Sequence, residues 1–137
     1  MSDERAKLYA AAASCTRYPV EAYEFLCHAL AFTQTALDRI PEPNTPPEKA
    51  LDKHVSGDEL CDGIRKFALD QFGPMAPVVF RNWGIDKTQD FGDMVFHLIH
   101  EGVWYASPHD RREDFANRYD FDAAFVRDYK VEWEDGE

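Results

Sequence analysis

The chain has 137 residues, 45% of them hydrophobic and 14% aromatic, which is enough apolar material for one buried core but not for two independent domains. Its 26 acidic residues outnumber the 15 basic ones, and the formal charge of -11 disfavours nucleic acid as a partner because phosphate groups would be repelled. No apolar run approaches the roughly 18 residues of a membrane span, and no signal-peptide pattern opens the chain, so we expect one cytoplasmic domain over residues 1–137.

Two helices and a loop are predicted for the first part of the chain. Residues 4–15 are rich in alanine and favour a short helix, and a longer helix is expected from Pro19 to Arg39, with proline in its first turn. Residues 41–53 contain four prolines among polar residues, a composition that predicts a mobile loop. The roughly 40 residues before this loop cannot form a core alone, so the helices on its two sides must pack together.

The helix predicted from Pro19 to Arg39 is apolar around more than half of its circumference. Projection at about 100° per residue gives two neighbouring stripes, one of Tyr23, Leu26, Leu30 and Leu37 and the other of Phe25, Ala29, Phe32 and Ala36. Such a helix is either central in the domain, with its second stripe beneath the C-terminal aromatics Phe121, Phe125 and Tyr129, or it faces another chain. In the second case Phe25, Ala29 and Phe32 would form the seam of a homodimer or of a complex with a protein partner.

Clear start and stop signals define the next two helices. Ser56 and Glu59 have the spacing of a capping box, so a helix begins there and ends at Gly73. A short helix is then expected over residues 75–83. It should end at Gly84, which can adopt the left-handed conformation that closes a helix.

The last predicted elements are an amphipathic helix, a β-prone segment and a C-terminal helix. Thr88 is expected to cap a helix over residues 89–101, and the β-prone residues 103–106 predict one short β-hairpin. Asp120 has the position of an N-cap for the last helix, and the acidic tail, residues 132–137, is expected to fray. The aromatic residues expected to dock on the core are Phe115, Tyr119, Phe121 and Phe125.

These elements predict a mainly α, compact multi-helix domain, and one version of the fold has a winged-helix-like core over residues 56–119. The order of helix, tight turn, helix and short strand between residues 75 and 105 is that of a helix-turn-helix followed by a wing. The would-be recognition helix has no Lys or Arg and is expected to expose Asp90, Asp93, His97 and Glu101, and its carboxylates would repel phosphate. A winged fold here would therefore belong to a protein-binding regulator.

A metal site is one hypothesis for the same helix. Asp93, His97 and His100 share one face at i, i+4 and i+7, and a carboxylate with two imidazoles can bind zinc or another divalent metal. His109 with Asp110 could supply a fourth ligand. The alternative is an ordinary solvated polar face, since the motif lacks the glutamate placement of a metalloprotease.

No nucleophile or phosphate-binding motif is evident. The chain lacks GxSxG, Walker A, GxGxxG and calcium-loop spacings, and its glycines sit where helices end. Cys15, Cys27 and Cys61 are far apart and odd in number, which predicts buried thiols in place of a disulfide framework or a zinc finger. The sequence thus favours a protein without catalytic activity.

Several short segments carry a resemblance to a known family. They are residues 18–26, 54–60, 72–73, 83–85, 90–92, 110–115 and 119–122. On these segments the chain resembles an uncharacterised conserved family restricted to Verrucomicrobia and Planctomycetes, over about residues 17–129. The resemblance implies a bacterial protein, and it transfers no activity, cofactor or site residue.

The leading functional interpretation is a non-catalytic helical module that binds a protein partner or a second copy of itself in a bacterial cytoplasm. The first alternative, from another class, is a small metal-dependent enzyme that uses Asp93, His97 and His100. The second is a winged-helix-like, transcription-associated regulator with Arg111 and Arg112 on its wing.

Overall fold

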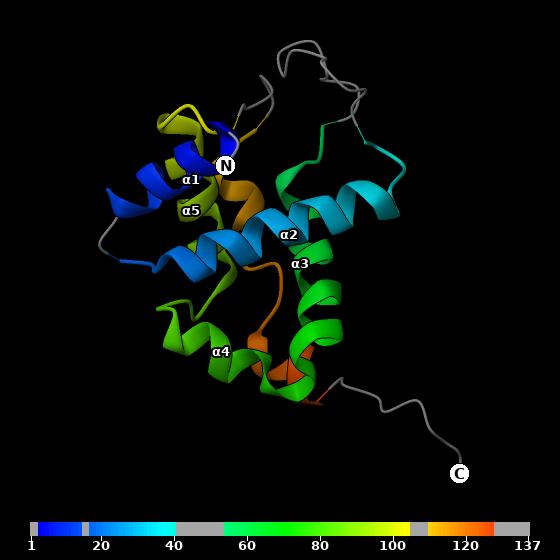
Figure 1. Ribbon diagram of the computed structural model, residues 1–137. Coiled ribbons are helices and arrows are strands. Elements are labelled where there is room, and N and C mark those ends of the chain that lie inside the picture. The colour runs from blue at the N-terminus through cyan, green and yellow to red at the C-terminus, as the bar shows by residue number, and fades with distance from the viewer. Residues whose placement is uncertain (1–2, 15–16, 41–53, 105–109, 128–137) are drawn as a thin grey trace.

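The computed structural model describes residues 3–14, 17–40, 54–104 and 110–127, and α-helices account for most of them (Figure 1). The helices are α1 (Asp3–Ala13), α2 (Val20–Ala36), α3 (Gly57–Phe72), α4 (Ala76–Asn82) and α5 (Thr88–His100). Three short turns accompany them: the 3-10 turns η3 (Gly73–Met75) and η4 (Arg112–Phe115), and the π-helical turn η5 (Ala123–Arg127). The prediction of a mainly α, compact fold is confirmed, and the predicted helices between residues 4 and 101 end within a few residues of the observed ones.

The predicted β-hairpin is not shown, because the described part of the chain contains no strand. Val103 and Trp104, at the start of the β-prone segment, form a bend, and both of their amides donate to the carbonyl of Leu98 at 2.9 and 3.2 Å. Gly102, with φ of 77°, turns the chain back onto α5 and so allows this capping. Residues 105–109 lie outside the described part, and the winged-helix-like core is likewise not shown.

Helix α2 crosses the middle of the molecule and packs against α1 and α3 (Figure 1). Its close approach to α3 depends on Gly63, where an added Cβ would come within 1.7 Å of the Thr33 hydroxyl oxygen. Thr33 itself is buried and donates its hydroxyl to the carbonyl of Ala29 at 2.7 Å. The two helices therefore meet backbone against side chain, which confirms that the segments on both sides of residues 41–53 pack together.

The turn η4 is held by a slot between α3 and α5. A Cβ on Gly57 of α3 would come within 2.9 Å of the Phe115 ring, and one on Gly92 of α5 would come within 2.9 Å of the Phe115 Cβ and Cγ. Phe115 is 3% exposed, so its ring fills the space that the two missing side chains leave. This contact ties the C-terminal part of the chain to both helices.

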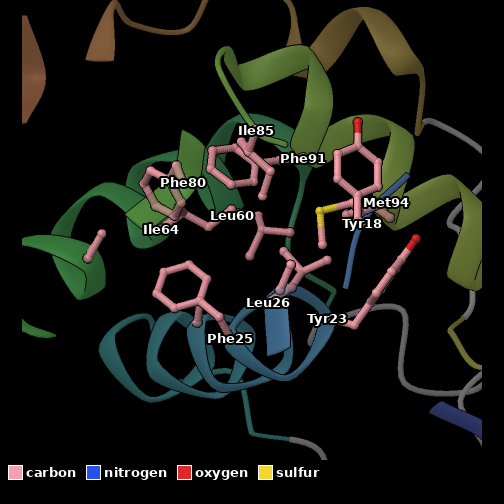
Figure 2. Packing of buried hydrophobic residues seen from close by; sticks show 14 of the residues in the cluster. Tyr18, Tyr23, Phe25, Leu26, Leu60, Ile64, Phe80, Ile85, Phe91 and Met94 are labelled. Atoms are coloured by element: carbon pink, nitrogen blue, oxygen red, sulfur yellow. The ribbon is translucent and has the colours of Figure 1, made fainter. Parts of the chain in front are cut away.

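Aromatic rings form the centre of the core (Figure 2). Phe25 of α2 lies 5.4–5.6 Å, between ring centroids, from Phe67, Phe72, Phe80 and Trp83. Phe80 of α4 continues the cluster to Phe91, Phe121 and Phe125 at 5.3–5.7 Å. Edge-on, tilted and stacked pairs of this kind add to the hydrophobic gain of burial. The central position predicted for α2 is therefore confirmed. Phe25 of its second stripe packs on rings of α3 and α4 and on Trp83, while Tyr129, one of the C-terminal aromatics predicted to cover that stripe, lies outside the described residues.

The predicted helix starts are confirmed at two places and wrong at one. Ser56 caps α3 in a complete capping box with Glu59, and Asp120 accepts a hydrogen bond from the amide of Ala123 at 3.0 Å. Thr88 does not cap α5, since its hydroxyl donates to the carbonyl of Phe115 at 2.6 Å and accepts from the amide of Arg118 at 3.1 Å. The hydroxyl of Thr88 is therefore used in a tertiary contact with residues 115–118 and does not cap the amides at the start of α5.

Arg39 joins the two ends of the segment that contains residues 41–53. Its guanidinium donates to the Glu59 carboxylate at 2.5 Å and to the backbone carbonyl of His54 at 3.2 Å. The predicted proline-rich loop, residues 41–53, and the predicted frayed tail, residues 132–137, lie outside the described residues. In the part that the structure describes, no helix is long and apolar enough to cross a membrane.

Candidate functional site

A fully buried carboxylate, Asp90, organises one side of the molecule. Its Oδ1 accepts from the Arg17 guanidinium at 2.7 Å and from the Tyr18 hydroxyl at 2.9 Å. Its Oδ2 accepts from the backbone amides of Asp86 and Lys87 at 2.9 and 3.3 Å. All of these donors come from the segment before α2 or from the turn before α5, so Asp90 joins the start of its own helix to residues that are 72 and 73 positions earlier in the chain.

The surroundings of Asp90 hold it in its charged form. Burial alone would raise the pKa of this carboxyl group, but the hydrogen bonds from Asp86 and Tyr18 and the charge of Arg17 lower the pKa below its ordinary value of 3.8. For Tyr18 the effects add: burial raises the pKa of the phenol well above its ordinary value, and the hydrogen bond to the Asp90 carboxylate raises it further. Neither group is poised to exchange a proton near neutral pH, so the pair is structural rather than an acid-base couple.

The charged network continues over the surface of α5. Asp93, one turn after Asp90, lies 2.8 Å from the Arg112 guanidinium and 3.8 Å from that of Arg17. Arg112 also lies over the ring of Phe96, with its Cζ 5.2 Å from the ring centroid. The acidic side chains of α5 are thus paired with Arg17, from the segment before α2, and with Arg112, from η4.

An open groove of about 680 Å³ lies next to this network. The C-terminal half of α1 and residues 17–20 form one wall, and residues 81–84 form the other. Its polar and aromatic lining consists of Tyr9, Arg17, Tyr18, Arg81, Asn82 and Trp83, and the rest is small or apolar.

The two walls of the groove meet at Gly84. This residue has φ of 81°, as predicted for the end of the preceding helix, and an added Cβ would lie 3.2 Å from the carbonyl oxygen of Arg17. The aromatic side chains are also held: Tyr9 donates to Glu24 at 2.8 Å, and the Trp83 ring lies 5.6 Å from that of Phe25. The groove is therefore formed before any ligand enters it, which lowers the cost of binding.

The structure does not assemble the metal ligands predicted from the sequence. His97 Nε2 lies 2.9 Å from the carbonyl of Ala11 and 3.1 Å from the Ser14 hydroxyl, both at the C-terminal end of α1. Asp93 is engaged by arginine, as described above, and His100 is exposed. Nowhere in the described ranges do three His, Cys, Asp or Glu side chains gather closely enough to hold a metal ion.

The proposed fourth metal ligand has another partner. Asp110 Oδ2 lies 2.7 Å from Nε2 of His54, while His109 lies outside the described residues. The sequence pattern could not show that α1 packs onto the histidine-bearing face of α5, because that contact joins residues more than 80 positions apart. The predicted site on Asp93, His97 and His100 therefore has no support from the geometry.

Two of the three predicted interface residues belong to the interior of this chain. Phe25 is 7% exposed and Ala29 is fully buried, so neither presents a surface to another molecule. Phe32 is half-buried and lies 5.5 Å, between ring centroids, from Phe67 of α3. Of the stripe that suggested a seam with another chain, Phe25 and Ala29 are thus covered within the same chain, whereas Phe32 is half-buried and Ala36 is exposed.

The described cysteines are unreactive by environment. Burial, with a smaller contribution from Glu24, raises the pKa of Cys27 to about 11, and burial raises the pKa of Cys61 to about 12. A thiol with such a pKa is almost entirely protonated at neutral pH and is a poor nucleophile. Cys15 lies outside the described residues.

Comparison with known proteins adds no identity to this geometry. No family model, curated protein or solved structure matches the chain. The resemblance to the family restricted to Verrucomicrobia and Planctomycetes therefore stays a prediction.

The Asp90 network and the groove beside it were not predicted from the sequence. Asp90 was expected on an exposed helix face, whereas the side chain is 0% exposed. A signal was available, because Asp90 is three residues after Lys87, the observed N-cap of α5, and an acidic residue at that position commonly accepts hydrogen bonds from the amides before the helix. Nothing in the local sequence indicated that Arg17 and Tyr18 would complete the site.

Proposed function

We propose that this domain is a non-catalytic module that binds a segment of a protein partner in the groove between residues 17–20 and 81–84. The observation that carries the proposal is the lining of the groove. It combines the half-buried Trp83 and Tyr9 with the exposed Arg17 and Arg81, and Trp, Tyr and Arg are the residue types that dominate the energetics of protein interfaces.

The state of the reactive side chains supports a binding role over a catalytic one. The carboxylate of Asp90 has its two oxygens occupied by four donors, and the thiols of Cys27 and Cys61 have raised pKa values. Among the residues of the metal-enzyme alternative, Asp93 is paired with Arg112 and His97 is bound to the end of α1. These side chains would have to break their hydrogen bonds and ion pairs before they could take part in catalysis.

The winged-helix-like regulator is the weaker alternative. Helix α4, the turn after it and α5 keep the order of a helix-turn-helix, but α5 is contacted by α1 and by η4. Its exposed face also carries Asp93 and Glu101, and no Lys or Arg comes from the helix itself. These observations favour the groove over α5 as the surface that meets a partner.

Site-specific photo-crosslinking tests the proposal. A benzophenone amino acid replaces Asn82, which lines the groove, and in a matched control it replaces Lys66, which is exposed on α3. In an extract of the source organism we expect one protein to be crosslinked from position 82 and not from position 66. The purified partner should then bind the unmodified domain, and Trp83→Ala should weaken this binding at least tenfold while the helical circular dichroism is kept. Equal crosslinking from both positions, or a partner that binds the Trp83→Ala variant as well as the wild type, would show that the groove is not the binding site.

A further inference from the structure

The charge of the groove differs from that of the molecule around it. The chain has a formal charge of -11, yet the lining of the groove contains two arginines and no Asp or Glu side chain. Arg81, at the end of α4, is exposed and has no ion-pair partner among the described residues. Because Arg17 is paired with the buried Asp90, the unpaired positive charge in this carboxylate-free lining is that of Arg81.

Arg17 is fixed in place before any ligand binds. One of its terminal nitrogens donates to the buried Asp90 carboxylate at 2.7 Å, and the other lies 3.8 Å from Asp93. The side chain is nevertheless 56% exposed, and a guanidinium has five N–H donors, of which the Asp90 contact uses one. Arg17 can thus donate to a second carboxylate without a change in its position, which makes the site preorganised for an acidic group.

The aromatic part of the lining adds a place for one apolar side chain. Trp83 is half-buried, with its ring packed on Phe25, Phe72 and Phe80, so its outer part is presented on a rigid support. Ala13 and Val20 add small apolar surface to the same lining. A groove of this kind accepts a short extended segment that has one apolar anchor between charged residues.

We propose that the segment bound in the groove is an acidic peptide of a partner protein, with carboxylates on Arg17 and Arg81 and an apolar anchor on Trp83. The inference rests on the proposed function and adds the chemistry of the ligand. Charge complementarity selects this occupant, because a basic segment would face the fixed guanidinium of Arg17, the exposed guanidinium of Arg81 and no carboxylate in the lining.

Three synthetic peptides of ten residues test this chemistry. Each carries a fluorescent label and a central tryptophan, flanked by four glutamates, four glutamines or four lysines, and binding to the full chain is followed by fluorescence polarisation. We expect the glutamate peptide to bind about tenfold more tightly than the glutamine peptide, and the lysine peptide not to bind.

A charge reversal provides the decisive comparison. Arg81→Glu changes an exposed residue outside the core, so the fold should be kept, and it should weaken the glutamate peptide more than tenfold while it allows the lysine peptide to bind. Lys66→Glu changes the net charge of the protein by the same amount on α3, away from the groove lining, and should leave all three affinities within about twofold. Equal weakening by both variants, or a wild-type preference for the glutamine or lysine peptide, overturns the inference.

Other occupants give distinct results. Binding of the glutamate peptide that improves at least tenfold when residues 132–137 are removed identifies the acidic tail of the chain itself as the resident segment. A mass that doubles with concentration in light scattering, and returns to that of the monomer in Arg81→Glu, identifies a second copy. Either result overturns the assignment to a partner. Crosslinking of a partner from position 82 together with failure of the glutamate peptide leaves the proposed function intact and refutes only the acidic chemistry.

Discussion

Replacement of Asp90 by asparagine removes one charge from the core with almost no change in volume. The carboxylate accepts from Arg17 and Tyr18 on one oxygen and from the amides of Asp86 and Lys87 on the other. An asparagine presents an NH₂ group on one of these two sides, so two donors lose their acceptor whichever way the amide is turned.

The magnitude follows from the number of donors left without a partner. A hydrogen bond to a charged acceptor contributes about 1.5–3 kcal/mol, so two lost bonds cost roughly 3–6 kcal/mol. Because water can reach the exposed part of Arg17, we expect the lower end, about 3 kcal/mol of unfolding free energy. For a chain of this length that corresponds to a fall in melting temperature of about 10 °C.

Urea unfolding at neutral pH, followed by circular dichroism, measures this loss as a lower midpoint at an unchanged m-value. The matched control is Asp93→Asn, which removes a carboxylate that is 44% exposed and pairs with arginine at the surface. Such pairs contribute up to about 1 kcal/mol. A loss below about 1 kcal/mol for Asp90→Asn, or equal losses for the two variants, would refute the claim that Asp90 stabilises the fold from a buried position.

The same variant has a signature in acid. The pKa of Asp90 is lower in the folded protein than its ordinary value of 3.8, so its charged form stabilises the fold fully above that value, and this contribution is lost as the pH falls below it. The pKa of Glu59 is also lowered, because the hydrogen bonds from Arg39 and Ser56 outweigh the opposing effect of burial. Unfolding free energy measured from about pH 7 to pH 3 should therefore fall less steeply in Asp90→Asn, with the Glu59 contribution retained. Identical acid slopes in the two proteins would contradict the pKa shift.

Two further predictions concern the core. Gly63→Ala should destabilise the protein by about 2–4 kcal/mol, because its Cβ would overlap the side chain of Thr33 and push α2 away from α3. The control is Gly102→Ala, whose Cβ would meet no atom within 4 Å. It should cost only roughly 1 kcal/mol, because alanine is strained in the left-handed backbone conformation of this residue. Chemical unfolding of both variants checks this, and similar losses would argue against a close helix crossing. In a Cys15→Ser variant, Cys27 and Cys61 should react with Ellman's reagent at pH 8 far more slowly in the native state than in urea, because burial raises the pKa of both thiols. A rapid reaction of the native protein would contradict the burial of the two thiols.

Local sequence signals determined the helices of this protein and several of their ends. The capping box of Ser56 and Glu59 and the left-handed Gly84 act within one turn of the chain, so their outcome depends on residues that are adjacent in sequence. The apolar stripes likewise identified Phe25 and Ala29 as residues that must be covered. What covers them was open, because a stripe carries no information about whether the covering surface belongs to the same chain.

The tertiary structure alone decided the use of the polar residues. Asp90, His97 and Thr88 all lie on α5, and the sequence placed the first two on an exposed face and made the third a cap. Each has a partner far away in the chain: Arg17, the carbonyl of Ala11 and the carbonyl of Phe115, respectively. A buried polar group must find a partner wherever the fold supplies one, and that choice is made when α1 and η4 pack onto α5. The groove arises in the same way, since Arg17 and Arg81 are 64 positions apart and line one groove only because the backbone of Gly84 lies close to that of Arg17.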